Sequence, residues 1–167
     1  HMVEKSFELS EVSNSPVMME LRIRACHVQG SFKAKDNVVA KVSSISKEEE
    51  PAPFLYARLS HPPVTFIQEK QKLEHRLPAA QKFILENQLN EVFSGDISSH
   101  GIIVQGGLFN TLMRRLSNLH LADAFGNSRI PILVLNVTHP LVPEQIQEFC
   151  LTKESVLVME EGNPEFI

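Results

Sequence analysis

Three short, uncharged and mostly apolar runs mark the C-terminal part of the chain. They are Gly101–Gln105, Ile132–Val137 within the longer run that starts at Ile130, and Val156–Met159. Helical spacing separates them, first at Leu108, Leu112, Arg115 and Leu116, and then over Pro143–Cys150. Apolar strands joined by helices are typical of a parallel sheet that is covered on both faces. We therefore expect an α/β fold, a three-layer α/β/α sandwich with these runs as adjacent parallel strands.

The stretch beyond Pro63 has the pattern of an amphipathic helix. Apolar residues recur at spacings of three, four and seven, at Phe66, Leu73, Leu77, Ala80, Ile84, Leu85, Leu89 and Val92. Pro78 interrupts this pattern, because proline lacks the backbone donor and its ring clashes with the preceding turn. We predict two helices or one kinked helix, with Pro78 in the first turn of the second piece.

The N-terminal third has a different character. Leu21, Ile23 and Ala25 alternate with polar residues, so Pro16–Val28 is expected to form a strand with one charged face. Gly30–Pro53 loses this order and is expected to be a solvated linker. His1 and Met2 are interpreted as the remnant of a cloning tag.

Composition and charge narrow the class of protein. The chain has 167 residues, of which 43% are hydrophobic, enough for one buried domain with an appendage. Its formal net charge of -4 gives no reason to expect nucleic acid or an anionic membrane as partner. The apolar runs are too short to span a bilayer, and no secretory signal pattern stands at the N-terminus. We expect a soluble, cytoplasmic chain.

The cysteine content argues against a metal centre. The two cysteines, Cys26 and Cys150, are far apart and belong to no Cys-x-x-Cys or Cys/His spacing. Cys26 and His27 are neighbours on the expected strand, so their side chains would point to opposite faces and form no nucleophile–base pair. A packed thiol is the better interpretation, and no metal site is expected.

Polar residues follow each of the three expected strands. Gln105, Gly106 and Gly107 end the first, while Asn136, Thr138 and His139 follow the second, and Glu160 follows the third. Ligands of open parallel sheets bind at this carboxyl edge, so these seven residues are the candidate ligand-binding set. The alternative is that such loops are polar and glycine-rich for structural reasons.

Several candidate residues have both a functional and a simpler structural interpretation. Gly106 and Gly107 can hold an anion at a helix start or form a tight turn with close strand–helix packing. His139 near Glu160 can act as a base with an orienting carboxylate, or make one loop hydrogen bond. Glu160 and Glu161 can bind a metal or cap the next element. Arg22 and Arg24 are candidates for anion binding or an interdomain contact, and a solvated ion pair is the alternative.

Four long stretches carry a resemblance to a known family. They are PVMMELRIRACHV, GIIVQGGLFNTLMRRL, LADAFGNSRIPILVLNVTHPLVPEQIQEFC and VLVMEEGNPEFI. In this order they resemble the central part of indolepyruvate ferredoxin oxidoreductase, of the 2-oxoacid:ferredoxin oxidoreductase superfamily. The resemblance excludes the stretch from Lys41 to Pro53, and none of its segments is a catalytic signature.

This resemblance implies a fold, a domain division and a reaction. Residues 60–167 would form a domain similar to the C-terminal domain of transketolase, and residues 1–59 would hold the tag remnant, the tail of a thiamine-binding pyrimidine module and a linker. The complete enzyme oxidatively decarboxylates aryl pyruvates to aryl-acetyl-CoA and reduces ferredoxin. It uses thiamine diphosphate, Mg and 4Fe–4S clusters. None of these groups is expected on this chain, and no catalytic role transfers to its residues.

Two functions are therefore considered. In the first, the chain is a noncatalytic scaffold that contacts other domains or subunits of this oxidoreductase, whose further partners are ferredoxin and CoA. In the second, it is a small-ligand module that binds CoA or a nucleotide at the strand ends. The sequence lacks the G-x-S-x-G motif and a metal cluster, which argues against a free-standing hydrolase. The first sixty residues are expected to fold less firmly and to favour homo-oligomers by pairing between two copies.

Overall fold

The computed structural model describes residues 1–21, 27, 29–37 and 54–161. The chain divides into two compact units, one of residues 1–19 and 72–167 and the other of residues 20–71. Within the described residues, none of the helices combines the length and the apolar character needed to cross a membrane.

A four-stranded mixed sheet forms the centre of the first unit. β2 (His100–Gln105) lies between β3 (Ile132–Leu135) and β4 (Ser155–Met159), and it is parallel to both. Ile103 pairs with Leu133 on one side and with Val158 on the other. The prediction of three adjacent parallel strands is therefore confirmed, although β3 ends at Leu135 rather than Val137.

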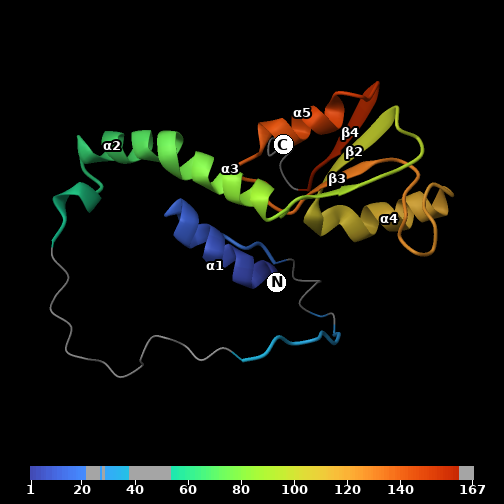
Figure 1. The fold of residues 1–167 in the computed structure, drawn as a ribbon, viewed down its shortest axis with the longest axis horizontal. Helices are drawn as coiled ribbons and strands as arrows, with labels where there is room; N and C mark the ends of the chain where they lie inside the picture. Colours follow the sequence, from blue (N-terminus) through green and yellow to red (C-terminus); the bar gives the residue numbers. More distant parts are fainter. Residues whose placement is uncertain (22–26, 28, 38–53, 162–167) are drawn as a thin grey trace. The chain divides into compact units, whose positions relative to one another are not determined.

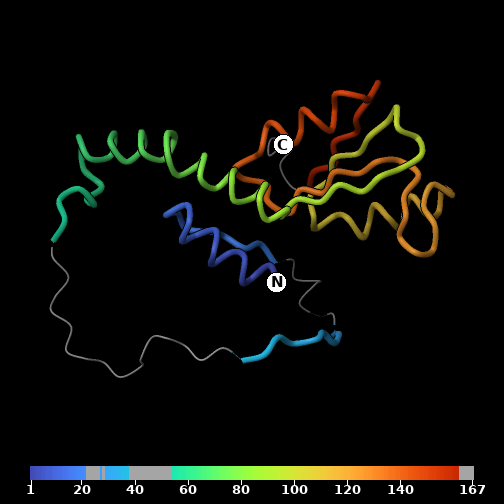
Figure 2. The backbone as a smooth tube through the Cα atoms, viewed as in Figure 1, coloured from blue at the N-terminus to red at the C-terminus, as the bar shows by residue number. Residues whose placement is uncertain are grey.

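Two helices cover the opposite faces of this sheet (Figure 1). α4 (Phe109–Asn118) follows a short 3-10 turn, η4 (Gly106–Leu108), and packs Leu112 and Leu116 on one face. α5 (Pro143–Cys150) packs Phe149 on the other face, against Ile103, Leu133 and Leu135. Figure 2 traces the connection from β2 through α4 to β3. The three-layer α/β/α fold expected from the sequence is confirmed.

The fourth strand, β1 (Glu91–Phe93), corrects the sequence interpretation. The helical spacing predicts that the helix continues through Leu89 and Val92. In the structure α3 (Leu77–Glu86) ends earlier, and Gln88 adopts a positive φ of 50°. Val92 pairs with Leu133 in an antiparallel ladder between β1 and β3. Its spacing matched a helix by coincidence, because a chain reversal separates it from α3.

The break at Pro78 is where the sequence predicts it. α2 (Val64–Gln71) is followed by a π-helical segment, η3 (Lys72–Arg76), and Pro78 is the second residue of α3. A proline ring crowds the carbonyl of the residue four positions before it, and a π-helical turn opens the backbone there. In the second unit, α2 is preceded by a 3-10 turn, η2 (Tyr56–Arg58), and Gln68 Nε2 donates to the Ala57 carbonyl at 3.2 Å.

The first helix, α1 (Met2–Ser13), was not expected. The interpretation of His1 and Met2 as a tag remnant placed no element before Pro16, yet Leu9 is 6% exposed and packs with Phe83 and Ile84 of α3. Lys5 Nζ also donates to Asn87 Oδ1 at 2.9 Å. Residues 1–13 are therefore part of the folded unit.

The strand expected over Pro16–Val28 is absent from residues 16–21, which contain no helix or strand. Arg22, Ile23, Arg24, Ala25, Cys26 and Val28 lie outside the described residues. Of the expected linker, residues 30–37 are described and contain no helix or strand, and residues 38–53 lie outside the described part.

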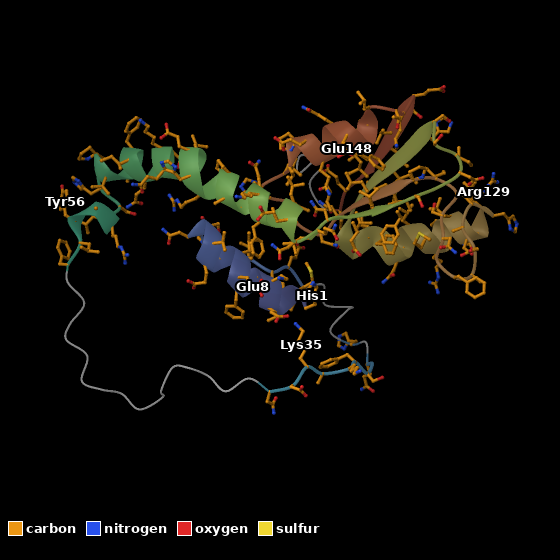
Figure 3. All side chains as sticks on the ribbon, viewed as in Figure 1. His1, Glu8, Lys35, Tyr56, Arg129 and Glu148 are labelled. Atoms are coloured by element: carbon orange, nitrogen blue, oxygen red, sulfur yellow. The ribbon has the colours of Figure 1, made fainter. Side chains whose placement is uncertain are left out.

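An exposed ion pair fixes the loop that precedes β3. The Arg129 guanidinium, labelled in Figure 3, donates to Asp96, with Nη2 3.0 Å from Oδ2. This contact lowers the pKa of Asp96 and raises that of Arg129. In the same loop, the Asp123 carboxylate accepts hydrogen bonds from the Phe125 and Asn127 backbone amides, and the Asn127 side chain holds its pKa low. The loop is thus held by carboxylates at two points.

We predict that copies of the chain associate through the segment around Leu21 and Ile23, and sedimentation of a double Leu21→Glu, Ile23→Glu variant tests this. Leu21 is 68% exposed, and two glutamates would repel their counterparts across a paired segment. The variant is expected to sediment as a monomer where the unchanged chain is a dimer. Substitution is preferable to truncation through Pro53, because that truncation also removes Leu9 from the core.

Asn110→Glu, which changes the charge at an exposed position near Gly106, serves as the control. It should leave the dimer intact. A dimer that survives the double substitution, or an unchanged chain that is monomeric, would contradict the prediction.

Candidate functional site

The carboxyl edge of the parallel sheet brings several of the sequence-predicted residues together. Gln105 is the last residue of β2, and its side-chain Oε1 accepts a hydrogen bond from the Glu161 backbone amide at 2.9 Å. This bond joins the end of β2 to the segment that leaves β4. The side-chain oxygen of Gln105 therefore already has a hydrogen-bond partner within the chain.

Asn136, directly after β3, is also engaged within the chain. Its Nδ2 donates to the Leu89 carbonyl and to Glu91 Oε2, both at 2.9 Å. These partners precede and begin β1, the strand that runs antiparallel to β3. The Asn136 side chain thus fastens the α3–β1 connection to the end of β3.

Gly106 faces Asn136 across the strand ends. A Cβ added at Gly106 would lie 2.5 Å from Asn136 Oδ1, well inside van der Waals contact. Any larger residue would have to move the Asn136 side chain, whose amide already holds two partners. A glycine at this position lets η4 and α4 begin immediately beside β3.

Asn90 is a buried polar residue that the sequence pattern does not single out. It is 4% exposed, its Oδ1 accepts from the Val137 amide at 3.0 Å, and its Nδ2 donates to Gln145 Oε1 at 3.0 Å. A buried amide must be satisfied, and here both of its ends are. Asn90 therefore couples the loop before β1, the loop after β3 and α5. A single asparagine after a helical pattern carries no signal that would reveal these partners.

The remaining candidates differ in exposure and contact. Gly107 and His139 are exposed, and Thr138 and Glu160 are half-buried. Within the described part of the chain, no hydrogen bond or ion pair joins His139 to Glu160. Arg22 and Arg24 lie outside the described residues. The role of His139 as a base with Glu160 as its orienting carboxylate stays a prediction.

The positions of the His, Cys, Asp and Glu side chains bear on metal binding. No group of three or more His, Cys, Asp or Glu side chains in the described residues is placed to hold a metal ion. Iron–sulfur clusters take four cysteine thiolates, whereas the whole sequence contains two cysteines. Two cysteines do not fit such a cluster.

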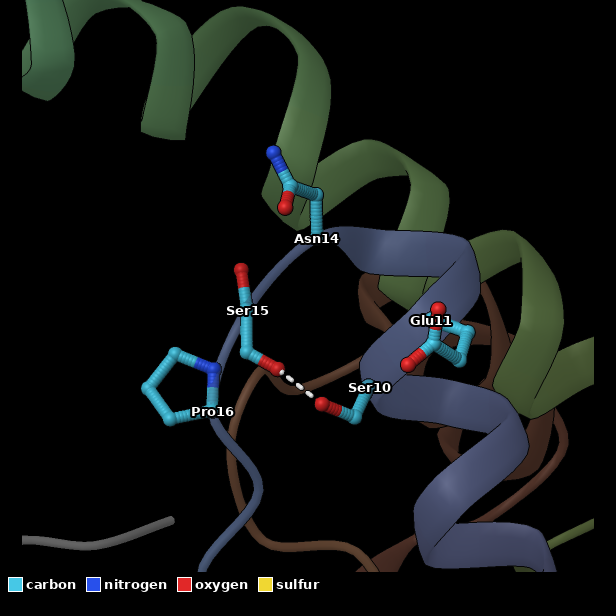
Figure 4. Close-up of a pocket in the computed structure, with 5 residues that line it drawn as sticks. All are labelled: Ser10, Glu11, Asn14, Ser15 and Pro16. Atoms are coloured by element: carbon cyan, nitrogen blue, oxygen red, sulfur yellow. Dashed lines mark hydrogen bonds between the residues drawn. The ribbon is translucent and has the colours of Figure 1, made fainter. Parts of the chain in front are cut away.

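Two hollows lie away from the carboxyl edge. The smaller, of about 290 Å³, adjoins the end of α1 and is lined by Ser10, Glu11, Asn14, Ser15 and Pro16 (Figure 4). Across it the Ser10 hydroxyl donates to the Ser15 carbonyl at 2.8 Å, which closes the end of the helix. The larger, of about 560 Å³, lies between β1 and α5.

Gly106→Ala should destabilise the fold, because the new methyl group overlaps Asn136 Oδ1. Overpacking of this kind costs about 1–3 kcal/mol, measurable as a lower free energy of unfolding in urea. Gly107→Ala is the matched control, since Gly107 is exposed, and it should cost less than about 1 kcal/mol. Equal losses of unfolding free energy in the two variants would show that the overlap with Asn136 is not the cause of the destabilisation.

Comparisons with known proteins identify relatives in two archaeal species. The chain is 30% identical over 162 residues to the indolepyruvate oxidoreductase subunit IorA of Methanothermobacter thermautotrophicus, and 29% identical over 157 residues to IorA of Methanothermobacter marburgensis. These alignments cover 95% and 93% of this chain but 24% and 23% of the relatives. The chain therefore spans about a quarter of the length of the curated relatives it matches.

Other comparisons add little. No protein-family model matches the chain. A solved structure of 2-oxoglutarate:ferredoxin oxidoreductase from Magnetococcus marinus, with 2-oxoglutarate, coenzyme A and succinyl-CoA bound, aligns with a TM-score of 0.39 and 18% identity. That alignment covers 64% of this chain and 17% of the other. The similarity to IorA over nearly the whole chain confirms the resemblance to indolepyruvate ferredoxin oxidoreductases that the sequence motifs carry.

Proposed function

We propose that the chain is a noncatalytic scaffold part of an indolepyruvate ferredoxin oxidoreductase that depends on thiamine diphosphate. The observation that carries this proposal is 30% identity to subunit IorA over 95% of the chain. The complete enzyme would oxidatively decarboxylate aryl pyruvates to aryl-acetyl-CoA and reduce ferredoxin. In it, this chain would contact other domains or subunits.

The arrangement of the carboxyl edge supports a structural role. Gln105 and Asn136, from the candidate set, and the buried Asn90 have their amide groups paired with other parts of the chain. Using these amides to bind a ligand would break bonds that hold β1, β3 and α5 together. A loss of one such bond at a buried group costs about 1–3 kcal/mol.

The cofactors of the complete enzyme would lie outside this chain. When bound, thiamine diphosphate stabilises the carbanion formed on decarboxylation, and the clusters carry the electrons onward. The part of this chain in the reaction would be to hold neighbouring modules in position. Its own residues would neither coordinate a cluster nor take up protons from the substrate.

The domain division expected from the resemblance is part of this proposal. Residues 60–167 would be the transketolase C-terminal-like domain, and residues 1–59 would hold the tag remnant, the tail of a pyrimidine module and the linker. Because Leu9 packs against Phe83 and Ile84, residues 1–13 would also pack on the α/β domain. A cytoplasmic location is likewise proposed, in keeping with an enzyme that delivers electrons to ferredoxin.

A second candidate function is the binding of CoA or a nucleotide at the strand ends. The observation in its favour is that Gly107, Thr138 and His139 lie at the carboxyl edge with their side chains or backbone accessible. A saturable interaction at these residues would favour this function over a scaffold.

Two measurements on the purified chain test the proposal. With indolepyruvate, thiamine diphosphate, Mg²⁺, CoA and ferredoxin supplied, we expect no reduction of ferredoxin, because the chain lacks a cluster ligand set. Titration with CoA and with ATP should leave the amide resonances of Gly106–Leu108 and Thr138–His139 unchanged. The IorA protein from Methanothermobacter with its partner subunit serves as the positive control for turnover.

Turnover by the chain alone would overturn the scaffold proposal. Saturable shifts at the strand ends without turnover would instead establish the ligand-binding function. Unchanged resonances together with no turnover are the result that the scaffold proposal predicts.

A further inference from the structure

The larger hollow, which we name the β1 groove, lies between the edge strand β1 and helix α5 and has a volume of about 560 Å³. It is distinct from the carboxyl-edge residues Gln105, Gly106 and Asn136, none of which lines it. The groove combines an apolar floor, a negatively charged wall and a strand edge.

The floor is formed by apolar side chains that the rest of the chain leaves exposed. Val92 is directly opposite Leu133 in the ladder, so both side chains lie on the sheet face that α5 covers. Leu133 is 0% exposed, whereas Val92 is 59% exposed and Leu85, at the end of α3, is 41% exposed. The cover of this face therefore ends between β3 and β1.

The wall is formed by Glu144 and Glu148 of α5. They are four residues apart, so their carboxylates lie on the same side of the helix, and both are exposed. Glu148 is labelled on α5 in Figure 3. Within the described residues neither makes a hydrogen bond or an ion pair. Gln145 is held by Asn90, and Lys153 lies over the Phe149 ring with Nζ 4.3 Å from its centroid. The two carboxylates outnumber the one Lys153 ammonium that also lines the groove, so the groove has a net negative charge that a cationic partner would complement.

The third feature is the outer edge of β1. The strand order is β1-β3-β2-β4, so β1 pairs with β3 on one side and, among the described residues, with no strand on the other. An edge of this kind presents unpaired backbone donors and acceptors to an added strand. Side chains of an added strand alternate between faces, so every second one would enter the groove.

We propose that the β1 groove binds an extended segment of a partner protein in which basic and apolar side chains are interspersed. The segment adds to the edge of β1, its apolar side chains cover Val92 and Leu85, and its basic side chains pair with Glu144 and Glu148. This deepens the proposed scaffold role and rests on it, because the partner is then another domain or subunit of the oxidoreductase.

The floor and the wall make different contributions. Covering two apolar side chains supplies most of the binding free energy, at about 25 cal/mol for each Å² buried. The exposed carboxylates contribute less each, about 0.2–1 kcal/mol, and they discriminate basic from acidic segments. Charge should therefore set the choice of partner and the salt dependence of binding.

The probe is a short peptide of sequence Lys-Thr-Val-Thr-Lys, in which the lysines and the valine share one face of a strand, titrated into the ¹⁵N-labelled chain at low salt. We expect saturable shifts of the amides of Val92, Phe93 and Ser94 and of α5 from Glu144 to Phe149. The matched peptide Glu-Thr-Val-Thr-Glu should bind at least about fivefold more weakly, since its carboxylates oppose those of the wall.

Variants of the chain separate charge from general surface binding. A double Glu144→Gln, Glu148→Gln variant should weaken binding of the lysine peptide about fivefold and lower its salt dependence. Glu11→Gln, which removes the same kind of charge from α1, is the control and should leave binding unchanged.

The proposal is overturned if the lysine peptide gives no saturable shifts at β1, if both peptides bind equally, or if the Glu11 control loses as much affinity as the double variant. Shifts on α5 without shifts on β1 would also contradict it, because the segment would then not be adding to the strand. None of these outcomes bears on turnover, so a failure here leaves the test of the scaffold role standing.

Discussion

β2 is hydrogen-bonded on both edges and covered on both faces, and the elements of the α/β unit are arranged around this strand. Ile102, Ile103 and Val104 are at most 4% exposed, and full burial of such side chains contributes about 1.5–3 kcal/mol each. Parallel neighbours require crossover connections, and these place α4 and α5 on opposite faces. A Cβ added at Gly101 would lie 2.5 Å from the Lys153 side chain and 2.9 Å from the Phe149 ring. Glycine at this position therefore lets the end of α5 and the segment that leads to β4 pack closely against β2.

The polar residues at the carboxyl edge extend this arrangement to β1. A three-residue antiparallel edge strand has few ladder bonds of its own, and Asn136 and Asn90 supply further bonds that hold its connection. These bonds reach back to the α3–β1 loop and forward to α5, so they link that loop and one helix to the ends of the strands. These amide side chains therefore stabilise the fold of the chain itself.

Much of this fold could be predicted from the sequence, because its signals are local. The apolar runs at β2, β3 and β4, the helix over Pro143–Cys150 and the break at Pro78 each follow from adjacent residues. β1 was missed because Leu89 and Val92 continue a helical spacing, and only the turn at Gln88 redirects the chain. The sequence pattern does not reveal α1, because polar and charged residues are interspersed along Met2–Ser13 and Leu9 is its one buried apolar residue.

The candidate site was predictable only as a location. Gln105, Gly106 and Asn136 were placed correctly at the carboxyl edge, but the hydrogen-bond partners of Gln105 and Asn136 lie 45 to 56 positions away in the sequence. Whether an amide binds a ligand or another part of its own chain depends on such distant contacts. The β1 groove was not predicted either, because its floor and its wall come from segments far apart in the sequence.

The central claim is that the polar carboxyl edge supports the fold, and urea denaturation of Asn136→Ala tests it most directly. The account predicts a loss of about 1–3 kcal/mol in the free energy of unfolding, because the Leu89 carbonyl and Glu91 lose their donor. Thr138→Ala, two positions further along, is the control and should change stability by less than about 0.5 kcal/mol. An Asn136→Ala variant as stable as the unchanged chain would contradict the account.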